Sequence, residues 1–446
     1  MSAIFNLARK SKKEPEDLSK VFYFTSNSPF SVELNDTSTK TWDGVIEYSF
    51  DNENWVTFEP TTVVTCSRGN GGKIYFRGTV NHTLSGDRSD AENIDDNDDP
   101  YAFFKLTGSK IACRGDITVL LDYLLLDDPT ASAPVMSEYC LYHLFKNCTS
   151  LVEASFIIPS FIDGYECCTS MFYGCSNLRV PPIIRMSKAS ENCFANMFKG
   201  CSSLISPPNL PLTTLADACY FCMFYGCTSL TTAPELPATV LTYGCYYNMF
   251  YGCTSLITAP RLPATVLTFA CYYEMFRGCS SLEIPPILSA TTLAESCCNG
   301  MFYDCTSLTI APELPATTLA ENCYYQMFYN CTSLTTAMSS LPAIIATTNC
   351  YYQMFYNCTS LTTTPRLLAT TLANACYGRM FKGCSSLEIP PALPATVTAE
   401  NCYNEMFYDC TALIALPALP ATSLAKNCYV NMFRATSSGS ALISAS

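Results

Sequence analysis

The sequence predicts an α+β fold in which a small N-terminal β-sandwich precedes a long solenoid of about twelve coils. The solenoid is predicted by a cysteine that recurs every 26 residues, with steps of 27 after Cys140 and after Cys323. A fixed period in this range is typical of repeat proteins in which each repeat forms one coil. The sandwich is predicted by short β-rich runs between residues 21 and 125, separated by Asn, Asp, Gly and Ser clusters. The recurring cysteines are Cys140, Cys167, Cys193, Cys219, Cys245, Cys271, Cys297, Cys323, Cys350, Cys376, Cys402 and Cys428.

Each coil is predicted to hold one short helix. With the leading cysteine numbered as position 0, the positions 0, +1, +4, +5 and +8 are nearly constant, and they fall on one arc of a helix at about 100° per residue. Position +3 varies from coil to coil, as expected of a solvent-facing arc. Position +7 is Gly, Asn or Asp in most coils, for example Gly252 and Asn330. These residues tolerate the left-handed conformation that ends a helix, so +7 is predicted to be its C-terminal cap.

The remainder of each coil is predicted to be extended. Leucine recurs at +11 and +17, and proline recurs near +15, as Leu256, Pro260 and Leu262 illustrate. Spacing by two indicates a segment with one face turned inward. Because proline cannot donate a backbone hydrogen bond, the segment should be short and partly irregular. A further inward leucine follows at +22, as at Leu267.

The internal copies read close to MFxGCTSLTTAPxLPATTLAxxCY. This pattern resembles the BspA-like leucine-rich repeats of surface proteins from gut Bacteroidetes and their bacteriophages, over about residues 140–433. The coil here is longer than the related type of about 23 residues, and it is richer in cysteine. The resemblance implies a right-handed solenoid used for adhesion or recognition, and it brings no catalytic residues and no cofactor.

The chain contains 28 cysteines. Of these, 23 occupy positions 0 and +8 on the arc predicted to be buried, where a free thiol packs as a small apolar group. We therefore predict reduced thiols, while crosslinks between neighbouring coils about 4.8 Å apart are the alternative that the spacing allows. A zinc site is not predicted, because no C-x-x-C pair is matched by a second pair and the chain has only two histidines.

Four segments are predicted: a charged arm at 1–20, the β-sandwich at 21–125, a joint at 126–139 and the solenoid with its C-terminal cap at 140–446. The β runs also resemble the β domain that precedes such repeats in gut-bacterial surface proteins and bacteriophage proteins. One loop, residues 85–100, is strongly acidic. Clustered carboxylates suit Ca²⁺, but the EF-hand spacing is absent, so an ordinary solvated loop is favoured and no metal is predicted. The calcium candidates are Asp95, Asp96, Asp98 and Asp99.

The candidate binding surface is a stripe at position +6, which holds Tyr, Lys or Arg in every coil. Exposed tyrosines in rows are enriched at recognition surfaces, because they give contact area at low entropy cost. The alternative is that these side chains stack on one another and stabilise the solenoid. The stripe residues singled out for binding are Tyr173, Lys199, Tyr225, Tyr251, Arg277, Tyr303, Tyr329, Tyr356, Lys382 and Tyr408. Catalysis is not predicted, since the chain shows no nucleophile–base pair, phosphate loop or zinc motif.

Charge and hydropathy limit the partners. The net charge is −13 and neither half is basic, which excludes nucleic acid as the expected partner. No apolar run is long enough for a membrane span, and the N-terminus places its apolar patch before its basic residues, the reverse of a secretory signal. We therefore expect a non-enzymatic recognition or adhesion protein of a bacteriophage virion, made in the host cytoplasm.

In this expectation the arm and the β domain join other virion or surface-assembly proteins, and the solenoid contacts a glycan or protein on the host surface. Two alternatives are left open: a purely structural spacer or decoration protein, and an adhesin on a bacterial cell surface. The oligomeric state is also left open.

Overall fold

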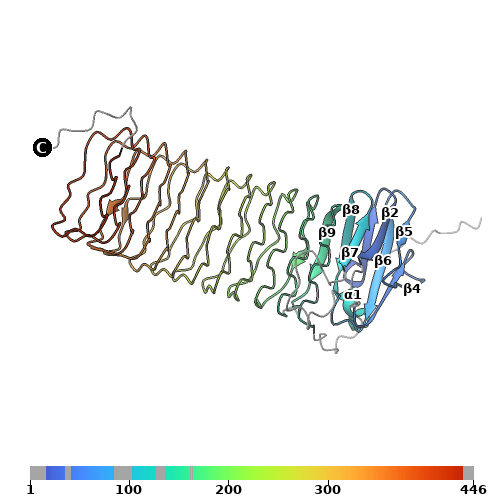
Figure 1. Ribbon diagram of the computed structural model, residues 1–446. Helices are drawn as coiled ribbons and strands as arrows, with labels where there is room; N and C mark the ends of the chain where they lie inside the picture. The colour runs from blue at the N-terminus through green and yellow to red at the C-terminus, as the bar shows by residue number, and fades with distance from the viewer. Residues whose placement is uncertain are drawn as a thin grey trace, which may run out of the picture.

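The computed structural model describes residues 17–35, 42–84, 103–126, 136–160, 162 and 164–434. It is an elongated solenoid with a β-rich region at its N-terminal end, and the chain runs coil by coil to the opposite end (Figure 1). The acidic loop at 85–100 with its four calcium candidates, most of the N-terminal arm, and the tail from 435 onward lie outside the described residues.

The N-terminal region contains two sheets. The larger sheet has seven strands in the order β10-β9-β8-β1-β6-β3-β4, and the smaller has three in the order β5-β2-β7. Within the described residues the only α-helix is α1 (Thr118–Asp122), with 3-10 turns at η1 (Leu18–Lys20) and η2 (Tyr123–Leu126). The strands are β1 (Phe22–Ser26), β2 (Phe30–Asn35), β3 (Val45–Ser49), β4 (Val56–Thr57), β5 (Val64–Cys66), β6 (Gly72–Thr79), β7 (Phe103–Thr107), β8 (Ile111–Asp116), β9 (Leu151–Ile158) and β10 (Ile183–Ile184).

The two sheets share an aromatic core. The ring centroid of Phe24 in β1 lies 5.7 Å from that of Phe76 in β6 and 5.3 Å from that of Phe104, which comes from β7 of the smaller sheet. All three side chains are buried, and both pairs are edge to face, the arrangement that the ring quadrupoles favour. The β-rich region predicted from the sequence is therefore present.

A free-standing small sandwich is not confirmed, because the larger sheet continues into the repeats. Strand β8 pairs in parallel with β9, which belongs to the first coil, and β9 pairs in parallel with β10. Across the first of these pairs Arg114 donates two hydrogen bonds to Glu153, at 2.7 and 2.9 Å. The pairing covers the edge of β8, which would otherwise present unpaired backbone groups. The predicted domain boundaries stay a prediction.

The helix predicted in each coil is wrong. Positions −1 to +8 instead form a series of turns, here called the turn ribbon, in which positions −1, +3 and +7 have positive φ. In the coil that begins at Cys245 these residues are Gly244 (52°), Asn248 (52°) and Gly252 (70°). A left-handed residue at every fourth position is incompatible with an α-helix, in which φ is negative throughout. The left-handed conformation expected at +7 is confirmed, but it belongs to a turn.

Hydrogen bonds between coils explain why the ribbon forms. The N–H groups at even positions bond within the coil to the carbonyl three residues earlier, as Met249 does to Tyr246 at 3.2 Å. The N–H groups at odd positions bond to the following coil, as Phe250 does to Met275 at 2.9 Å. Buried backbone donors must find partners, and here the neighbouring coil supplies half of them. This partner does not exist for a single repeat considered alone.

Side chains at the same position stack from coil to coil to form the core. The rings of Phe250 and Phe276, both at +5, lie 5.5 Å apart and within 1° of parallel. The cysteine at +8 donates its S–H to the carbonyl of the +5 phenylalanine in the preceding coil, as Cys253 does to Phe224 at 3.1 Å. Burial raises the pKa of Cys253 to about 12, so the proton needed for this bond is retained. Both cysteine rows are buried, as predicted.

The rest of each coil is extended but contains little regular strand. Neighbouring coils are joined by isolated parallel bridges, such as Thr258 with Ile284. The remaining strands have two residues each and pair in parallel, β11 (Ser340–Leu341) with β13 (Arg366–Leu367) and β12 (Ile345–Ala346) with β14 (Thr371–Leu372). Leucines at +11, +17 and +22 point inward, as Leu256, Leu262 and Leu267 do with 0, 2 and 4% exposure. The predicted short, irregular segment is confirmed.

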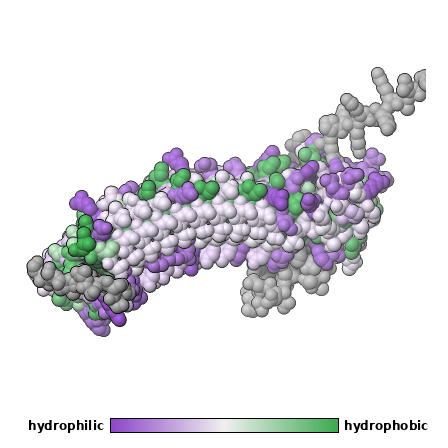
Figure 2. Space-filling model, turned by 90° about the horizontal axis from the view of Figure 1, so that it is seen from above, coloured by the Kyte–Doolittle hydropathy of each residue, from purple (hydrophilic) through white to green (hydrophobic). Residues whose placement is uncertain are grey.

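The face of the solenoid seen in Figure 2 is mostly of intermediate hydropathy. Figure 2 shows a broad pale band along the visible face and a group of hydrophobic residues at the C-terminal end. In the last complete coil Leu424 is 64% exposed, whereas Leu241 at the same position of an internal coil is 5% exposed. The difference arises because each internal coil covers the leucines of its neighbour.

Candidate functional site

The stripe at +6 runs along the outer side of the turn ribbon. All ten residues singled out for binding are half-buried, which is less exposed than the sequence analysis expected. The cause is mutual stacking: the ring centroids of Tyr225 and Tyr251 are 4.5 Å apart, and those of Tyr329 and its neighbours Tyr303 and Tyr356 are 4.4 and 4.5 Å apart. The faces of these rings contact one another. The stripe therefore presents ring edges to solvent, and stacking of a ligand on its inner rings is ruled out.

The cations of the stripe lie between tyrosines. The Nζ atom of Lys199 is 5.7 Å from the ring centre of Tyr173 and 5.0 Å from that of Tyr225. Arg277 lies in the same way between Tyr251 and Tyr303, with its Cζ atom 5.6 and 4.1 Å from their ring centres. Such cation–π contacts stabilise the row and hold the charges in place.

Acidic residues at +3 pair with some of these cations. Glu405 accepts a hydrogen bond from Lys382 at 2.7 Å, and Arg379 lies 3.2 Å away. Burial opposes ionisation of Glu405, but the hydrogen bond from Lys382 and the two positive charges outweigh it and hold the pKa of this carboxyl below its usual value. Glu274 pairs similarly with Arg277.

Burial, reinforced by the neighbouring phenols Tyr303 and Tyr356, raises the pKa of Tyr329 to about 12. The stripe hydroxyls with raised pKa stay neutral at physiological pH, so they can both donate and accept hydrogen bonds. The chemistry that the stripe offers is therefore a line of phenol hydroxyls interrupted by fixed positive charges.

A second aromatic row lies beside the stripe at position +2. Phe221 stacks on Tyr247 at 5.0 Å, and Tyr247 stacks on Tyr273 at 4.6 Å. Unlike the stripe, this row has gaps, because several coils carry a small or non-aromatic residue there. The last three coils have Gly378, Asn404 and Val430 at +2, and near the N-terminal end Thr169 and Ala195 make a double gap in two adjacent coils.

This double gap leaves a hollow of about 630 Å³ between Tyr142 of the first coil and Phe221 of the fourth. Sequence reasoning identified the stripe at +6 but missed the hollow. The signal was the pair of missing aromatic residues, and only the stacking of coils turns it into a cavity. The hollow is lined by Tyr142, His143, Lys146, Asn147, Glu166, Thr169, Ser170, Tyr173, Asn192, Ala195, Asn196, Lys199 and Phe221.

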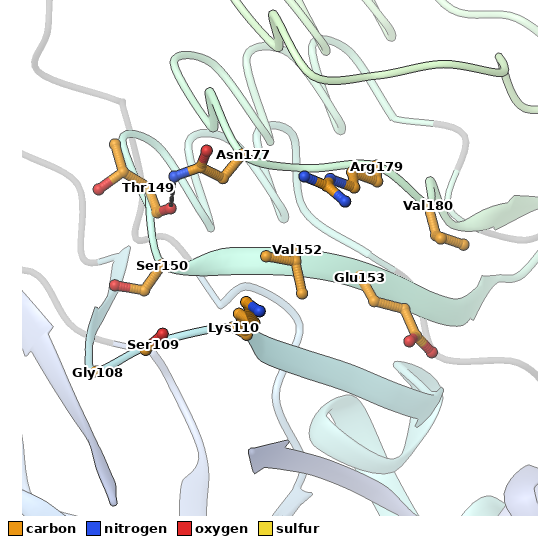
Figure 3. Close-up of a pocket in the computed structure, with 10 residues that line it drawn as sticks. All are labelled: Gly108, Ser109, Lys110, Thr149, Ser150, Val152, Glu153, Asn177, Arg179 and Val180. Carbon is orange, nitrogen blue, oxygen red and sulfur yellow. Dashed lines mark hydrogen bonds between the residues drawn. The ribbon is translucent and has the colours of Figure 1, made fainter. Parts of the chain in front are cut away.

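Another pocket, of about 640 Å³, lies where the β-rich region meets the first coils. Figure 3 shows that it is an open groove beside strand β9, with Val152 between the cations Lys110 and Arg179. Both cations are exposed, while the Glu153 carboxylate is held by Arg114. Among the described residues, the lining contains no histidine and no cysteine. Within the part of the chain that the structure describes, no cluster of three or more potential metal ligands is found. No helix among the described residues has the length and hydropathy of a membrane span.

Comparison with known proteins finds a match to one protein family. The model for the BspA type leucine rich repeat region (6 copies) matches residues 198–335 and 274–414, which together make up just under half of the chain. Among solved structures, the chain is similar to a leucine-rich repeat protein from Bacteroides ovatus ATCC 8483, with 21% identity, a TM-score of 0.35, and coverage of 65% of this chain and 80% of that one. At that TM-score the similarity supports no conclusion about the fold or function of this chain. The comparison with curated proteins found no match.

Proposed function

This chain carries BspA-type leucine-rich repeats, and on that premise we propose that it is a non-enzymatic binding protein whose turn-ribbon face contacts a partner on a cell surface. Repeats of this type suggest a protein-binding or adhesion role. The observation that carries the proposal is the stripe at +6, which keeps Tyr, Lys or Arg in each coil although position +3 beside it varies. Packing alone does not require hydroxyls and cations at a half-exposed position.

The geometry favours a protein partner for the stripe over a sugar. The ring faces are covered by stacking, so the row cannot offer the flat aromatic platform that a sugar ring needs. It offers ring edges, phenol hydroxyls and positioned cations, which suit the polar and acidic groups on a protein surface. Tyrosines held in a stack also lose little rotamer freedom on binding.

Two locations are proposed. BspA-type repeats occur commonly in bacterial surface proteins, which supports a bacterial cell-surface adhesin. The finer proposal is a bacteriophage virion protein assembled in the host cytoplasm, and its support is the core of protonated thiols. The S–H groups at +8 donate to backbone carbonyls, a role that requires the reduced form. In either location the N-terminal arm and the β-rich region are proposed to attach the protein to its assembly.

A purely structural role is the second candidate, because the stripe stacks continuously and thereby stabilises the solenoid. The triple variant Y251F/Y303F/Y329F distinguishes the binding role from the structural role, because it keeps the rings and removes three hydroxyls. The binding proposal expects retention of the protein on a panel of bacterial and epithelial cells to fall at least fivefold, with an unchanged melting temperature. Unchanged retention would leave only the structural role.

The matched control is Y220F/Y377F/Y403F. These tyrosines lie at +1, are buried, and have hydroxyls without a hydrogen-bond partner among the residues that the structure describes. Removing three buried, unpaired hydroxyls should not lower stability, and it should leave retention on cells unchanged. If the control loses retention as well, the effect does not come from the stripe.

A further inference from the structure

We propose that the hollow in the +2 row is a carbohydrate subsite that takes a short glycan of about two rings. The proposal rests on the proposed binding function and adds a ligand class and a place to it. The hollow lies over the second and third coils, where Thr169 and Ala195 replace the aromatic side chains that occupy +2 in neighbouring coils.

The size of the hollow follows from the missing rings. Neighbouring rings of the +2 row are 4.6 to 5.3 Å apart where two aromatic residues follow each other. Tyr142 and Phe221 are three coils apart, which corresponds to about 14 Å at about 4.8 Å per coil. Two stacked rungs are absent from this interval, which leaves the hollow long enough for a ligand of two linked rings.

The end walls are aromatic. Phe221 has one face stacked on Tyr247 and lines the hollow with the rest of its ring. At the other end Tyr142 and His143 are in ring contact, with centroids 3.9 Å apart. Aromatic walls here bound a space large enough for a ring, and the apolar faces of sugar rings pack on such walls.

The floor and sides are polar, which favours a sugar over an aromatic side chain. Ser170 is only 5% exposed, lines the hollow, and its hydroxyl forms no hydrogen bond with the described residues. Asn196 also lines the hollow, although its amide oxygen is buried and has no hydrogen-bond partner among the described residues, as is the case for Asn248 at the same position outside the hollow. Thr169 in the floor already donates its hydroxyl hydrogen to the carbonyl of Asn192.

Buried polar groups without partners cost free energy, and they are commonly satisfied by a bound molecule or by water. An aromatic side chain placed here would leave the Ser170 hydroxyl without a partner, whereas a sugar hydroxyl can donate to it or accept from it. The lining adds the cations of Lys146 and Lys199 and the carboxylate of Glu166. The site is therefore built for a hydroxyl-rich ligand without a large net charge.

The test is to fill the hollow with a larger side chain. In the variant A195Y a tyrosine takes the backbone position that already holds tyrosine in other coils, so the fold is expected to be retained or stabilised. The full-length protein is applied to an array of bacterial and mammalian oligosaccharides, and the strongest bound glycan is then titrated by calorimetry. We expect binding by the natural protein and at least a tenfold weaker affinity for A195Y.

The control is N299Y, which places tyrosine at +2 in another gap of the same row, away from the hollow, and should bind the glycan as the natural protein does. A second variant, S170A, keeps the cavity and removes one hydroxyl; it should weaken binding about fivefold. The proposal is overturned if no glycan on the array binds, if the bound glycan is insensitive to A195Y, or if A195Y abolishes retention on cells without any glycan being bound.

The stripe variant Y251F/Y303F/Y329F separates this inference from the proposed function. Its substitutions lie outside the hollow, so glycan affinity should be unchanged. A protein that binds the glycan but does not attach to any cell would retain the subsite and overturn the proposed adhesion. A protein that attaches to cells through the stripe and binds no glycan would overturn the subsite and leave the proposed adhesion in place.

Discussion

Asn248 provides a direct test of the turn ribbon, because a ribbon and a helix predict opposite effects of the same two substitutions. Its φ is 52°, in the left-handed region, and it lies at +3, which a helix would place in its interior. We compare N248G with N248A, so that loss of the asparagine side chain is common to both. In the left-handed region alanine is disfavoured by about 1–2 kcal/mol, whereas glycine adopts it freely.

Glycine also makes the unfolded chain more flexible, which costs about 0.4–1 kcal/mol relative to alanine. The net expectation is that N248G is more stable than N248A by about 0.5–1 kcal/mol. In a helix interior the order would reverse, with alanine favoured by about 1 kcal/mol. The two interpretations therefore differ in sign.

The measurement is urea unfolding followed by circular dichroism, with the shift in midpoint multiplied by a common slope. The control pair is E235G and E235A, at an exposed position without positive φ, where alanine should be the more stable variant. If N248A proves more stable than N248G while the control behaves as expected, the left-handed residue at +3 and the turn ribbon are refuted.

Two further predictions concern the core and the charges. The variant C253A loses both a buried sulfur and the S–H donor to Phe224, so it should be destabilised by about 1–2 kcal/mol. The variant C222A removes a buried cysteine at a +3 position and should cost less; equal losses in urea unfolding would show that the hydrogen bond contributes nothing. The variant E405Q should lower stability at pH 7 by up to about 1 kcal/mol, because Glu405 pairs with Lys382 and Arg379. Since the folded pKa of Glu405 is depressed, this contribution is complete above its unfolded value near 4.5 and is lost as pH falls through the folded pKa. The stability gap between E405Q and the natural protein should therefore narrow as pH falls below 4.5, and a gap that stays constant over that range in pH-dependent thermal unfolding would contradict the ion pair.

The comparison of sequence with structure shows why the helix prediction failed. Inward positions 0, +4 and +8 repeat every four residues, and over so short a run a period of four and the helical period of 3.6 select nearly the same side chains. A local signal for the ribbon was present. Position −1 holds asparagine in several coils, and Asn192, Asn322 and Asn427 all have positive φ. Asparagine at −1 together with glycine at +7 indicates left-handed residues at a regular spacing.

The sequence by itself determined the solenoid, its period and the inward residues of each coil. It could do so because every coil repeats the same burial requirement, so that Cys245, Phe250 and Leu256 are identified by recurrence alone. The left-handed residue at +7 was also predictable, since it depends only on local backbone sterics.

Only the tertiary structure decided between helix and ribbon, because half of the N–H groups in the ribbon bond to the next coil. It also decided that the stripe tyrosines cover one another's faces and that the β sheet continues into the repeats through β8 and β9. The hollow also depends on contacts between coils. Thr169 and Ala195 are 26 residues apart, and stacking of their coils is what places the two missing rings side by side. The physical reason is common to all of these features: they arise from contacts between coils, and a single repeat does not contain its neighbour.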